Sequence, residues 1–471
     1  MFATVHVPDP GAIHCCVMST LTAFKAYDVR GRIPAELNED LAYKIGQAYV
    51  GFLKPKRVCV GRDIRLSSAQ LCQALIRGLT DSGADVYDIG LCGTEGVYFG
   101  TFSGGFDGGI MVTASHNPPD YNGMKFVREQ SKPISADSGL MDMARLIETN
   151  QLPPKAGAPG RVTSLDMNSR YDAHLLGYVD RAKLKPLRVV VNAGNGGAGM
   201  VIDRLEPHLP FQFIKIHHEP DGTFPNGVPN PMLEENRQPT IDAILKHRAD
   251  VGLAWDGDFD RCFFFDENGT FIEGYYLVGL LAEVFLKREK GARIVHDPRL
   301  TWNTLDIVAK NGGKAVLSKS GHAFIKQVMR DCDGAYGGEM SAHHYFRDFA
   351  YADSGMIPWL IVLQVISETG KSLSQLVGER MRMFPASGEI NRKLASDKGG
   401  AKAVLGRAEA QYKAQAKSVD YTDGLSMEFD NWRFNIRASN TEPLVRLNVE
   451  SRGDEALMKA KTAELLALMD A

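Results

Sequence analysis

Three aspartates stand two residues apart at the end of an apolar run, in the segment GLAWDGDFDRCFFF. They are Asp256, Asp258 and Asp260, and Arg261 follows directly. In an extended chain, residues two apart point the same way, so the three carboxylates would converge and repel one another unless a cation neutralised them. Oxygen ligands of this kind suit magnesium or calcium. An EF-hand is excluded because Glu267 is not at loop position 12. The alternative is a solvated acidic turn.

A second segment, MVTASHNPPDYNGMKF, places Ser115 beside His116 and ends with Lys125 close behind. By itself it could be an ordinary turn with a solvated lysine. Three aspartates, however, leave coordination positions on a magnesium ion that water and phosphate oxygens commonly fill. A phosphorylated Ser115 could supply such an oxygen, which makes this serine a candidate phosphoryl carrier.

Near the C-terminus, RASNTEP offers Arg437, Ser439, Asn440 and Thr441 between two expected strands. A guanidinium, two hydroxyls, an amide and loop N–H groups could form a phosphate cradle. The same residues could equally form a hairpin turn with one arginine on its rim.

Two further loops carry polar groups suited to a sugar. GGEMSAHHYF exposes Glu339 and Ser341, an acceptor and a donor for hydroxyls. The adjacent His343 and His344 resemble metal ligands, but neighbouring residues seldom share one ion, which favours a packing or rim role. KSGHAF places His322 before an expected helix, whose N-terminal dipole could help to hold an anion.

The segment VVVNAGNGGAG matches the G-x-G-x-x-G pattern of dinucleotide-binding proteins through Gly194, Gly196 and Gly199, and Glu219 lies at a distance suited to a ribose contact. An NAD-dependent enzyme is therefore the competing class. It would leave the aspartates and the serine loop unexplained, whereas glycine loops between strand and helix are commonly tight turns.

Composition excludes several classes of protein. The chain of 471 residues is too long for one core, and its net charge of −3 gives no general attraction to nucleic acid or anionic membranes. Seven scattered cysteines without CxxC spacing argue against disulfides and zinc and for a reducing, cytoplasmic location. The longest apolar runs fall short of the ~20 residues that span a bilayer. We expect no nucleic-acid or membrane partner.

The chain alternates between expected strands and helices. RVCVG and GGIMVTA are typical of buried strands, and TEGVYFGTF and SSAQLCQALIRGLTDSG of helices, the latter with a serine N-cap and a glycine stop. Such alternation predicts sheets covered on both faces, whereas MEFDNWRFNIRAS and LVRLNVES predict antiparallel strands with one wet face. The expected divisions are a disordered extension over 1–19 and domains over 20–163, 164–272, 273–385 and 386–471.

Together these motifs resemble the α-D-phosphohexomutase superfamily, most closely its bacterial phosphomannomutase/phosphoglucomutase members. TASHNP, DGDFDR, GEMS and RASNT occur in the expected order, and FKAYDVRG supports the match, which runs from about Phe24 to the end. The resemblance implies three successive α/β mixed-sheet domains plus a C-terminal α+β domain around one central cleft.

The resemblance also implies roles for individual residues. Ser115 would be the phosphoserine, assisted by Lys125 and His116, and would share a magnesium ion with Asp256, Asp258 and Asp260. The implied substrate-binding residues are Tyr27, Arg30, Arg261, Arg299, His322, Glu339, Ser341, Arg437, Ser439, Asn440 and Thr441. This chain departs from many relatives at Ala342, where they have glycine, and at Arg299, where some have lysine.

The implied activity is the interconversion of hexose 1-phosphate and hexose 6-phosphate, of mannose, glucose or both, through a 1,6-bisphosphate intermediate. One Mg²⁺ per chain, a glucose or mannose 1,6-bisphosphate activator and a monomer or weak dimer are expected. Phosphoglucosamine mutase, which typically has glutamine in place of Met340, and a metal-dependent sugar phosphatase are the alternatives.

Overall fold

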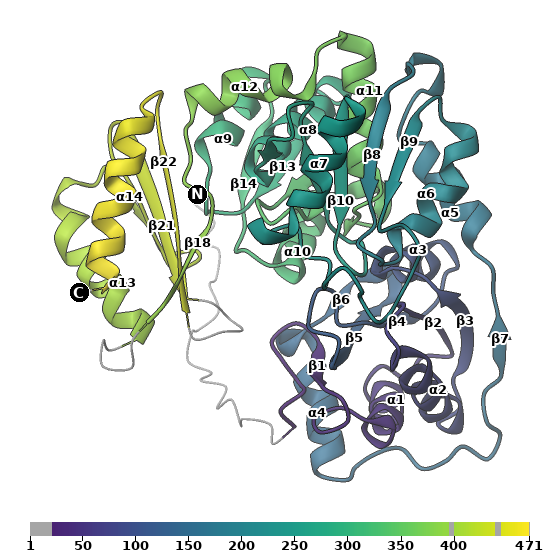
Figure 1. Cartoon of the computed structure of the whole chain (residues 1–471). Coiled ribbons are helices and arrows are strands. Elements are labelled where there is room, and N and C mark those ends of the chain that lie inside the picture. Colours follow the sequence, from purple (N-terminus) through teal and green to yellow (C-terminus); the bar gives the residue numbers. More distant parts are fainter. Residues whose placement is uncertain (1–20, 395–399, 439–443, 471) are drawn as a thin grey trace, which may run out of the picture.

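Four β-sheets, each with its own helices, follow one another along the chain (Figure 1). The computed structural model describes residues 21–394, 400–438 and 444–470. The predicted extension over 1–19 lies outside these residues. Three sheets are mixed and the fourth is antiparallel, which confirms the predicted fold class. The predicted domain boundaries stay predictions, and β7 (Val162–Ser164) spans the first of them.

The first domain contains a seven-stranded sheet in the order β1-β5-β4-β2-β3-β7, with β6 paired to β5. Its strands are β1 (Val29–Arg32), β2 (Arg57–Arg62), β3 (Asp85–Leu91), β4 (Gly108–Val112), β5 (Tyr121–Arg128), β6 (Pro133–Ile134) and β7. Its helices are α1 (Glu39–Leu53), α2 (Ser68–Asp81), α3 (Thr94–Ser103) and α4 (Leu140–Glu148).

Two features of this domain bear on the predictions. β4 and β5 are antiparallel neighbours, in register from Gly108 opposite Arg128 to Val112 opposite Met124, so the chain that leaves β4 returns beside it. α2 begins and ends as predicted, with Ser67 at the N-cap position. Its side chain makes no capping bond, however, because the backbone of Ser67 is helical (φ −83°, ψ −12°) and not extended as at a typical N-cap, and its Oγ accepts a hydrogen bond of 2.8 Å from Asn122.

The second domain has the strand order β12-β11-β10-β8-β9. Its strands are β8 (Arg188–Asn192), β9 (Gln212–Ile216), β10 (Val251–Trp255), β11 (Cys262–Phe265) and β12 (Phe271–Ile272), and its helices are α5 (Asn168–Leu176), α6 (Ala198–Leu205) and α7 (Gln238–His247). β10 is buried along its whole length, which explains its unbroken apolar sequence. The tight turn from β10 into antiparallel β11 carries the three aspartates.

The third domain has the strand order β14-β13-β15-β16-β17. Its strands are β13 (Arg293–His296), β14 (Lys314–Leu317), β15 (Tyr336–Gly338), β16 (His344–Phe346) and β17 (Ala352–Asp353), and its helices are α8 (Gly274–Arg288), α9 (Trp302–Lys310), α10 (His322–Cys332), α11 (Ile357–Thr369) and α12 (Leu373–Met383). The turn between β15 and β16 carries the GEMS motif, and α10 starts at His322 as expected.

The fourth domain has the antiparallel order β18-β22-β21-β20-β19, and it stands apart from the other three on the left of Figure 1. Its strands are β18 (Ile390–Lys393), β19 (Ser418–Asp420), β20 (Leu425–Glu428), β21 (Trp432–Ala438) and β22 (Leu444–Ser451), and its helices are α13 (Gly400–Tyr412) and α14 (Glu455–Asp470).

A buried carboxylate joins the fourth domain to the third. Glu450 on β22 is fully buried and accepts hydrogen bonds from the hydroxyl of Tyr275, from the backbone N–H of Thr301 at 2.7 Å and from Arg433 at 2.8 Å. Elsewhere, one large apolar cluster contains side chains from the first three domains, among them Phe99, which links their cores. None of the described helices is long and apolar enough to cross a membrane.

Candidate active site

The three aspartates converge in the turn between β10 and β11. All three are buried, and a carboxylate oxygen from each lies within 4.8 Å of the others. Phe259 between them adopts a positive φ of 48° and is buried, which keeps the turn tight. Gly257 is required by a close approach, since a Cβ there would lie 2.5 Å from the carbonyl oxygen of Ser115.

Ser115 lies directly against this turn. Its Oγ donates a hydrogen bond of 2.9 Å to Asp256 Oδ2, although the two residues are 141 positions apart. The same Oγ is 3.0 Å from His116 Nδ1. Ser115 is only 3% exposed and has a φ of 49°, a conformation that non-glycine residues adopt mainly under tertiary constraint. The segment between β4 and β5 therefore presents the hydroxyl to the aspartates.

A buried arginine that sequence analysis missed holds the serine loop in shape. Arg65 donates hydrogen bonds to the backbone carbonyls of four loop residues, at distances from 2.6 to 3.0 Å: Ser115, Asn117, Pro118 and Tyr121. A guanidinium carries enough donors for this role, and a lysine ammonium does not.

Arg261 connects the aspartates with the histidine. Its Nε donates to Asp256 Oδ2 at 2.9 Å, and its Nη2 contacts His116 Nδ1 closely. Burial, reinforced by the charge of Arg261, holds the pKa of His116 well below its ordinary value of 6.5. His116 is therefore neutral, and Nδ1, which faces an arginine donor, carries the lone pair.

Lys125 returns from β5 into the same cluster. Its Nζ donates to Asp258 at 2.7 Å, to Asp260 at 2.6 Å and to the hydroxyl of Thr94 at 3.2 Å. Burial lowers the pKa of Lys125, but the two carboxylates outweigh it and hold the pKa above its ordinary value. The lysine is thus an ammonium here, which differs from the lowered pKa that a lysine base needs.

The three aspartates have different pKa values because different cationic side chains lie beside them. Burial raises the pKa of Asp256 above its ordinary range despite the nearby Arg261. Burial acts on Asp260 too, but Lys125 and Arg261 reverse its effect and keep the pKa low. Asp258 is likewise held low by Lys125. Two carboxylates are therefore anionic, and the third is the most readily protonated.

This donor set fits a hard divalent cation. Three carboxylates and the Ser115 hydroxyl meet at one point, and hard oxygen ligands are those that magnesium prefers. Oδ1 of Asp258 and Oδ1 of Asp260 are buried and accept no hydrogen bond from any residue that the structure describes. A buried carboxylate oxygen that lacks a hydrogen-bond donor destabilises the folded state, and a bound cation would remove this cost.

The predicted sugar-binding residues of the third domain lie together. Arg299 Nη2 is 2.7 Å from Asp297 and 3.3 Å from both Glu339 Oε1 and Ser341 Oγ. Glu339 also accepts a hydrogen bond of 2.6 Å from the hydroxyl of Tyr345. Charged and polar groups are thus fixed in the turn after β15.

The N-terminal motif and His322 lie at the opposite side of this turn. The rings of Tyr27 and His322 are 5.6 Å apart, so the first domain contacts the start of α10. Arg30 donates to Asn117 Oδ1 at 2.6 Å and pairs with Asp28, which places it beside the serine loop. Burial holds the pKa of His322 well below 6.5.

The predicted phosphate cradle is described in part. Arg437, the next-to-last residue of β21, donates to Glu389 Oε2 at 2.8 Å, and the same oxygen is 3.2 Å from Arg299. Glu389 thus joins the third-domain and fourth-domain arginines, and burial is outweighed by these charges so that its pKa falls to about 2. Ser439, Asn440 and Thr441 lie outside the described residues.

The G-x-G-x-x-G segment has a packing role. A Cβ on Gly196 would lie 2.8 Å from the carbonyl oxygen of Gly257 in the aspartate turn, and one on Gly199 would lie 2.3 Å from the carbonyl oxygen of His218. Close approach of two backbones therefore explains these glycines. Glu219 joins this loop through its backbone carbonyl, which accepts a hydrogen bond of 2.9 Å from Asn195.

Thr94 and Glu389, like Arg65, were missed by sequence analysis. Each acts on partners far away in sequence: Thr94 on Lys125 and Asp258, and Glu389 on Arg299 and Arg437. None lies in a motif, so no local signal pointed to them.

Four family models match the chain in succession. All are described as phosphoglucomutase/phosphomannomutase: alpha/beta/alpha domains I, II and III match residues 21–150, 169–269 and 273–384, and the C-terminal domain matches residues 389–467.

Individual proteins match over nearly the full length. A phosphomannomutase of Escherichia coli is 60% identical over 96% of this chain and 100% of its own. Proteins of Xanthomonas campestris named phosphohexose mutases are 58% identical over 96% of this chain and 99% of theirs. A solved structure of a phosphoglucomutase/phosphomannomutase family protein from Burkholderia thailandensis is 31% identical, with a TM-score of 0.86 over 96% of this chain and 97% of that one.

Proposed function

Because this chain belongs to the phosphoglucomutase/phosphomannomutase family, we propose that Ser115 is the phosphoryl carrier of its reaction. The chain is a phosphohexomutase, an isomerase that transfers phosphate within a hexose phosphate. The observation that carries the proposal is the position of Ser115 Oγ, 2.9 Å from Asp256 Oδ2 and 3.0 Å from His116 Nδ1.

In the proposed cycle, a phosphoryl group on Ser115 moves to the free hydroxyl of a hexose monophosphate. The bond between phosphorus and Ser115 Oγ breaks, a bond to the sugar oxygen forms, and the hydroxyl proton of the sugar finishes on Oγ. The resulting 1,6-bisphosphate turns over, and its other phosphate returns to Ser115 by the reverse exchange. No atom is gained or lost, as isomerisation requires.

The side chains around Ser115 have two proposed roles, which are proton transfer and stabilisation of negative charge. Nδ1 of the neutral His116 lies 3.0 Å from Oγ and would hold a proton in transit when Arg261 Nη2, which contacts the same nitrogen, turns to the phosphoryl oxygens. Lys125 and Arg261 are cationic and stabilise the negative charge of the moving phosphoryl group. A role for Lys125 as the base would require its two carboxylate partners to be neutralised.

Asp256, Asp258 and Asp260, with an oxygen on Ser115, would hold one Mg²⁺. When bound, the ion supplies positive charge to the transferring oxygens. The buried carboxylate oxygens without hydrogen-bond partners support this assignment.

We propose that the other predicted site residues bind the substrate. Arg299, Glu339 and Ser341 would bind sugar hydroxyls, with His322, Tyr27 and Arg30 at the edge of the same site. Arg437 with Ser439, Asn440 and Thr441 would hold the phosphate that is not reacting. Relatives named phosphomannomutase favour a mannose phosphate, and glucose phosphate is the second substrate tested below.

The activator, the partners, the location and the oligomeric state of the enzyme are also proposed. We propose that a glucose or mannose 1,6-bisphosphate activates the enzyme by restoring phosphorylated Ser115. A small-molecule substrate, a cytoplasmic location and a monomer or weak dimer complete the proposal. The net charge of −3 supports the expectation of no nucleic-acid or membrane partner.

A coupled assay with mannose 1-phosphate and glucose 1-phosphate, with and without Mg²⁺ and bisphosphate, tests this function. We expect conversion to the 6-phosphate that depends on Mg²⁺, and little release of inorganic phosphate. Release of phosphate without isomerisation would favour a phosphatase. Conversion of glucosamine 1-phosphate alone would favour the phosphoglucosamine mutase alternative.

A further inference from the structure

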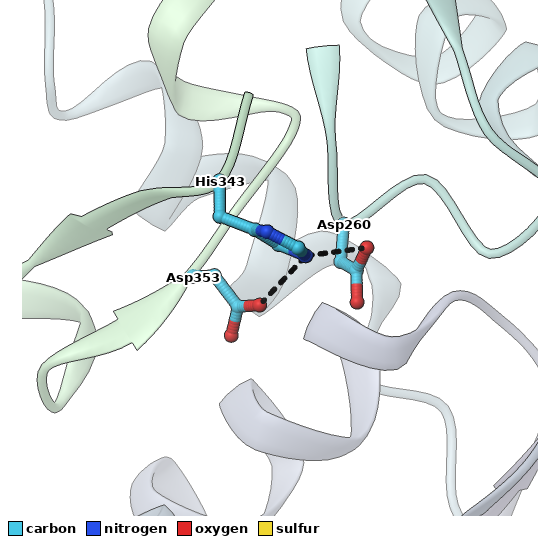
Figure 2. Close-up of side chains that lie close together, drawn as sticks. All are labelled: Asp260, His343 and Asp353. Atoms are coloured by element: carbon cyan, nitrogen blue, oxygen red, sulfur yellow. Dashed lines mark ion pairs between the residues drawn. The ribbon is translucent and has the colours of Figure 1, made fainter. Parts of the chain in front are cut away.

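A second cluster of potential metal ligands lies where the second and third domains meet. Asp260 comes from the turn after β10, His343 precedes β16, and Asp353 ends β17. His343 Nε2 is 3.7 Å from Asp260 Oδ1 and 4.0 Å from Asp353 Oδ2. Figure 2 shows the imidazole ring reaching between the two carboxylates. One atom from each residue lies within 4.8 Å of the other two.

The carboxylate oxygens that face His343 accept no hydrogen bond from any residue that the structure describes. Asp353 is fully buried, and Lys326 Nζ lies 2.6 Å from its Oδ1, which leaves Oδ2 without a hydrogen bond from any described residue. Asp260 Oδ2 accepts a hydrogen bond from Lys125, whereas its Oδ1 accepts none from any described residue and lies 3.8 Å from Arg261 Nε. Asp353 Oδ2 lies outside the proposed magnesium site, and a buried oxygen there that lacks a hydrogen bond and faces an imidazole nitrogen indicates a missing ligand, because such an atom is costly to bury.

The other ring nitrogen of His343 is oriented as in known metal sites. Nδ1 lies 3.5 Å from Glu339 Oε2 and 3.4 Å from Ser341 Oγ. Metal-bound histidines commonly direct their second nitrogen at a carboxylate, which fixes the tautomer and leaves the first nitrogen free to bind. The side chain of His343 is 16% exposed, so solvent reaches the cluster.

We infer that Asp260 Oδ1, His343 Nε2 and Asp353 Oδ2 form a second divalent-cation site that prefers zinc-like ions to Mg²⁺. An imidazole nitrogen suits zinc, cobalt and nickel, whereas Mg²⁺ prefers oxygen alone. Bonds of about 2.1 Å in a tetrahedral zinc site would separate the ligand atoms by about 3.4 Å. The two separations from His343 Nε2, 3.7 and 4.0 Å, are close to this value, and solvent would supply the fourth ligand.

Occupation of this site would affect the reaction. Its Asp260 is shared with the proposed magnesium site, and its other ligands flank the turn that carries Glu339 and Ser341. A zinc-like ion would tie the aspartate turn to the sugar-binding turn, so we expect inhibition that added Mg²⁺ does not relieve. The expected inhibition rests on the proposed function, whereas the binding of a zinc-like ion at this site does not.

Equilibrium dialysis against Zn²⁺ in excess Mg²⁺, followed by metal analysis, tests the binding. The wild-type chain should retain one zinc equivalent, and His343→Gln should weaken this binding at least tenfold. Asp353→Asn alone would leave Lys326 buried without its partner, so the second variant combines Asp353→Asn with Lys326→Met. His218→Gln, at an imidazole that pairs with Asp203, is the control and should bind as wild type.

Thermal melting establishes that each variant is folded, and the two variants remove different ligands. Absence of retained zinc in the wild type would overturn the inference. Undiminished zinc binding in a folded His343→Gln or double variant would also overturn it, since the ion would then lie elsewhere. Failure of the isomerisation assay in the wild type would refute the proposed function and leave this binding result intact.

Discussion

At the scale of single residues, the mechanism depends on one hydroxyl held between an aspartate and a histidine. Ser115 Oγ can contact Asp256 and His116 together because the serine adopts a left-handed backbone conformation in a buried loop. The neutral histidine and the two cations nearby give the serine both a proton acceptor and charge stabilisation.

Ser115→Ala removes the proposed carrier oxygen and little else. We expect the isomerisation rate to fall by on the order of 10³-fold or more, and the free energy of unfolding to fall by about 1 kcal/mol because the buried hydrogen bond to Asp256 is lost. Ser131→Ala is the control, because that buried serine donates to the carbonyl of Tyr98 away from the aspartates. It should lose about 1 kcal/mol of stability and keep its activity. Equal activity in Ser115→Ala and wild type would contradict the carrier role.

Arg65→Lys tests the support of the serine loop. A lysine cannot satisfy the four carbonyls that Arg65 binds, so some would stay buried without donors. We expect the free energy of unfolding to drop by about 1–3 kcal/mol and kcat to fall more than KM rises. Denaturant unfolding and steady-state kinetics measure the two effects. A variant with lower stability but unchanged kcat would show that Arg65 does not position Ser115.

At the scale of elements, the site is built from turns that leave buried strands. The segments after β4, β10 and β15 carry Ser115, the three aspartates and Glu339, respectively. Rigid strands fix where each turn begins, and glycines allow the turns to touch. At Gly257, an added Cβ would lie 2.5 Å from the carbonyl oxygen of Ser115.

Gly257→Ala should separate the aspartate turn from the serine loop. The added Cβ would meet the carbonyl oxygen of Ser115 at 2.5 Å, a backbone atom that cannot move alone. We expect a marked loss of kcat and a lower melting temperature. Gly406→Ala within α13 has nothing within 4 Å of its added Cβ and should instead gain about 0.5–1 kcal/mol. Unchanged kcat in Gly257→Ala would contradict the importance of this contact.

Sequence patterns predicted the motif-bearing turns well, because an apolar strand followed by charged residues is a local signal. β4, β10 and α3 follow the expected segments closely. The sequence patterns could not reveal the roles of Arg65 or Glu389, because the partners of these residues are distant in sequence. The serine cap predicted for α2 does not form because Ser67 has a helical backbone conformation, and its hydroxyl instead accepts a hydrogen bond from Asn122 on β5. Partners brought together only by the tertiary fold determine such side-chain roles.

At the scale of the whole molecule, buried polar groups join the domains. Glu95 on α3 accepts hydrogen bonds from Tyr171 of α5 and from the backbone N–H of Met356, so it links three domains. Burial raises the pKa of Glu95 from 4.5 to about 8. The folded protein therefore keeps a proton there between these values, where the unfolded chain has released it.

This shift predicts how stability depends on pH. Since the folded state binds the extra proton, the contribution of Glu95 to the free energy of unfolding is complete below pH 4.5 and lost as pH rises to about 8. The slope is at most about 1.4 kcal/mol per pH unit. Thermal melts between about pH 5 and about pH 9 should show a steeper decline in wild type than in Glu95→Gln. Parallel curves would contradict the assignment.

The central claim is that phosphate travels through Ser115, and it is tested most directly by following that phosphate. Enzyme phosphorylated with a labelled hexose 1,6-bisphosphate is mixed with unlabelled mannose 1-phosphate, and the Ser115 peptide is analysed by mass spectrometry over a single turnover. The account predicts that label leaves Ser115 and appears in sugar phosphate as quickly as isomerisation proceeds. Isomerisation that proceeds while Ser115 is never labelled, or never loses its label, would contradict it.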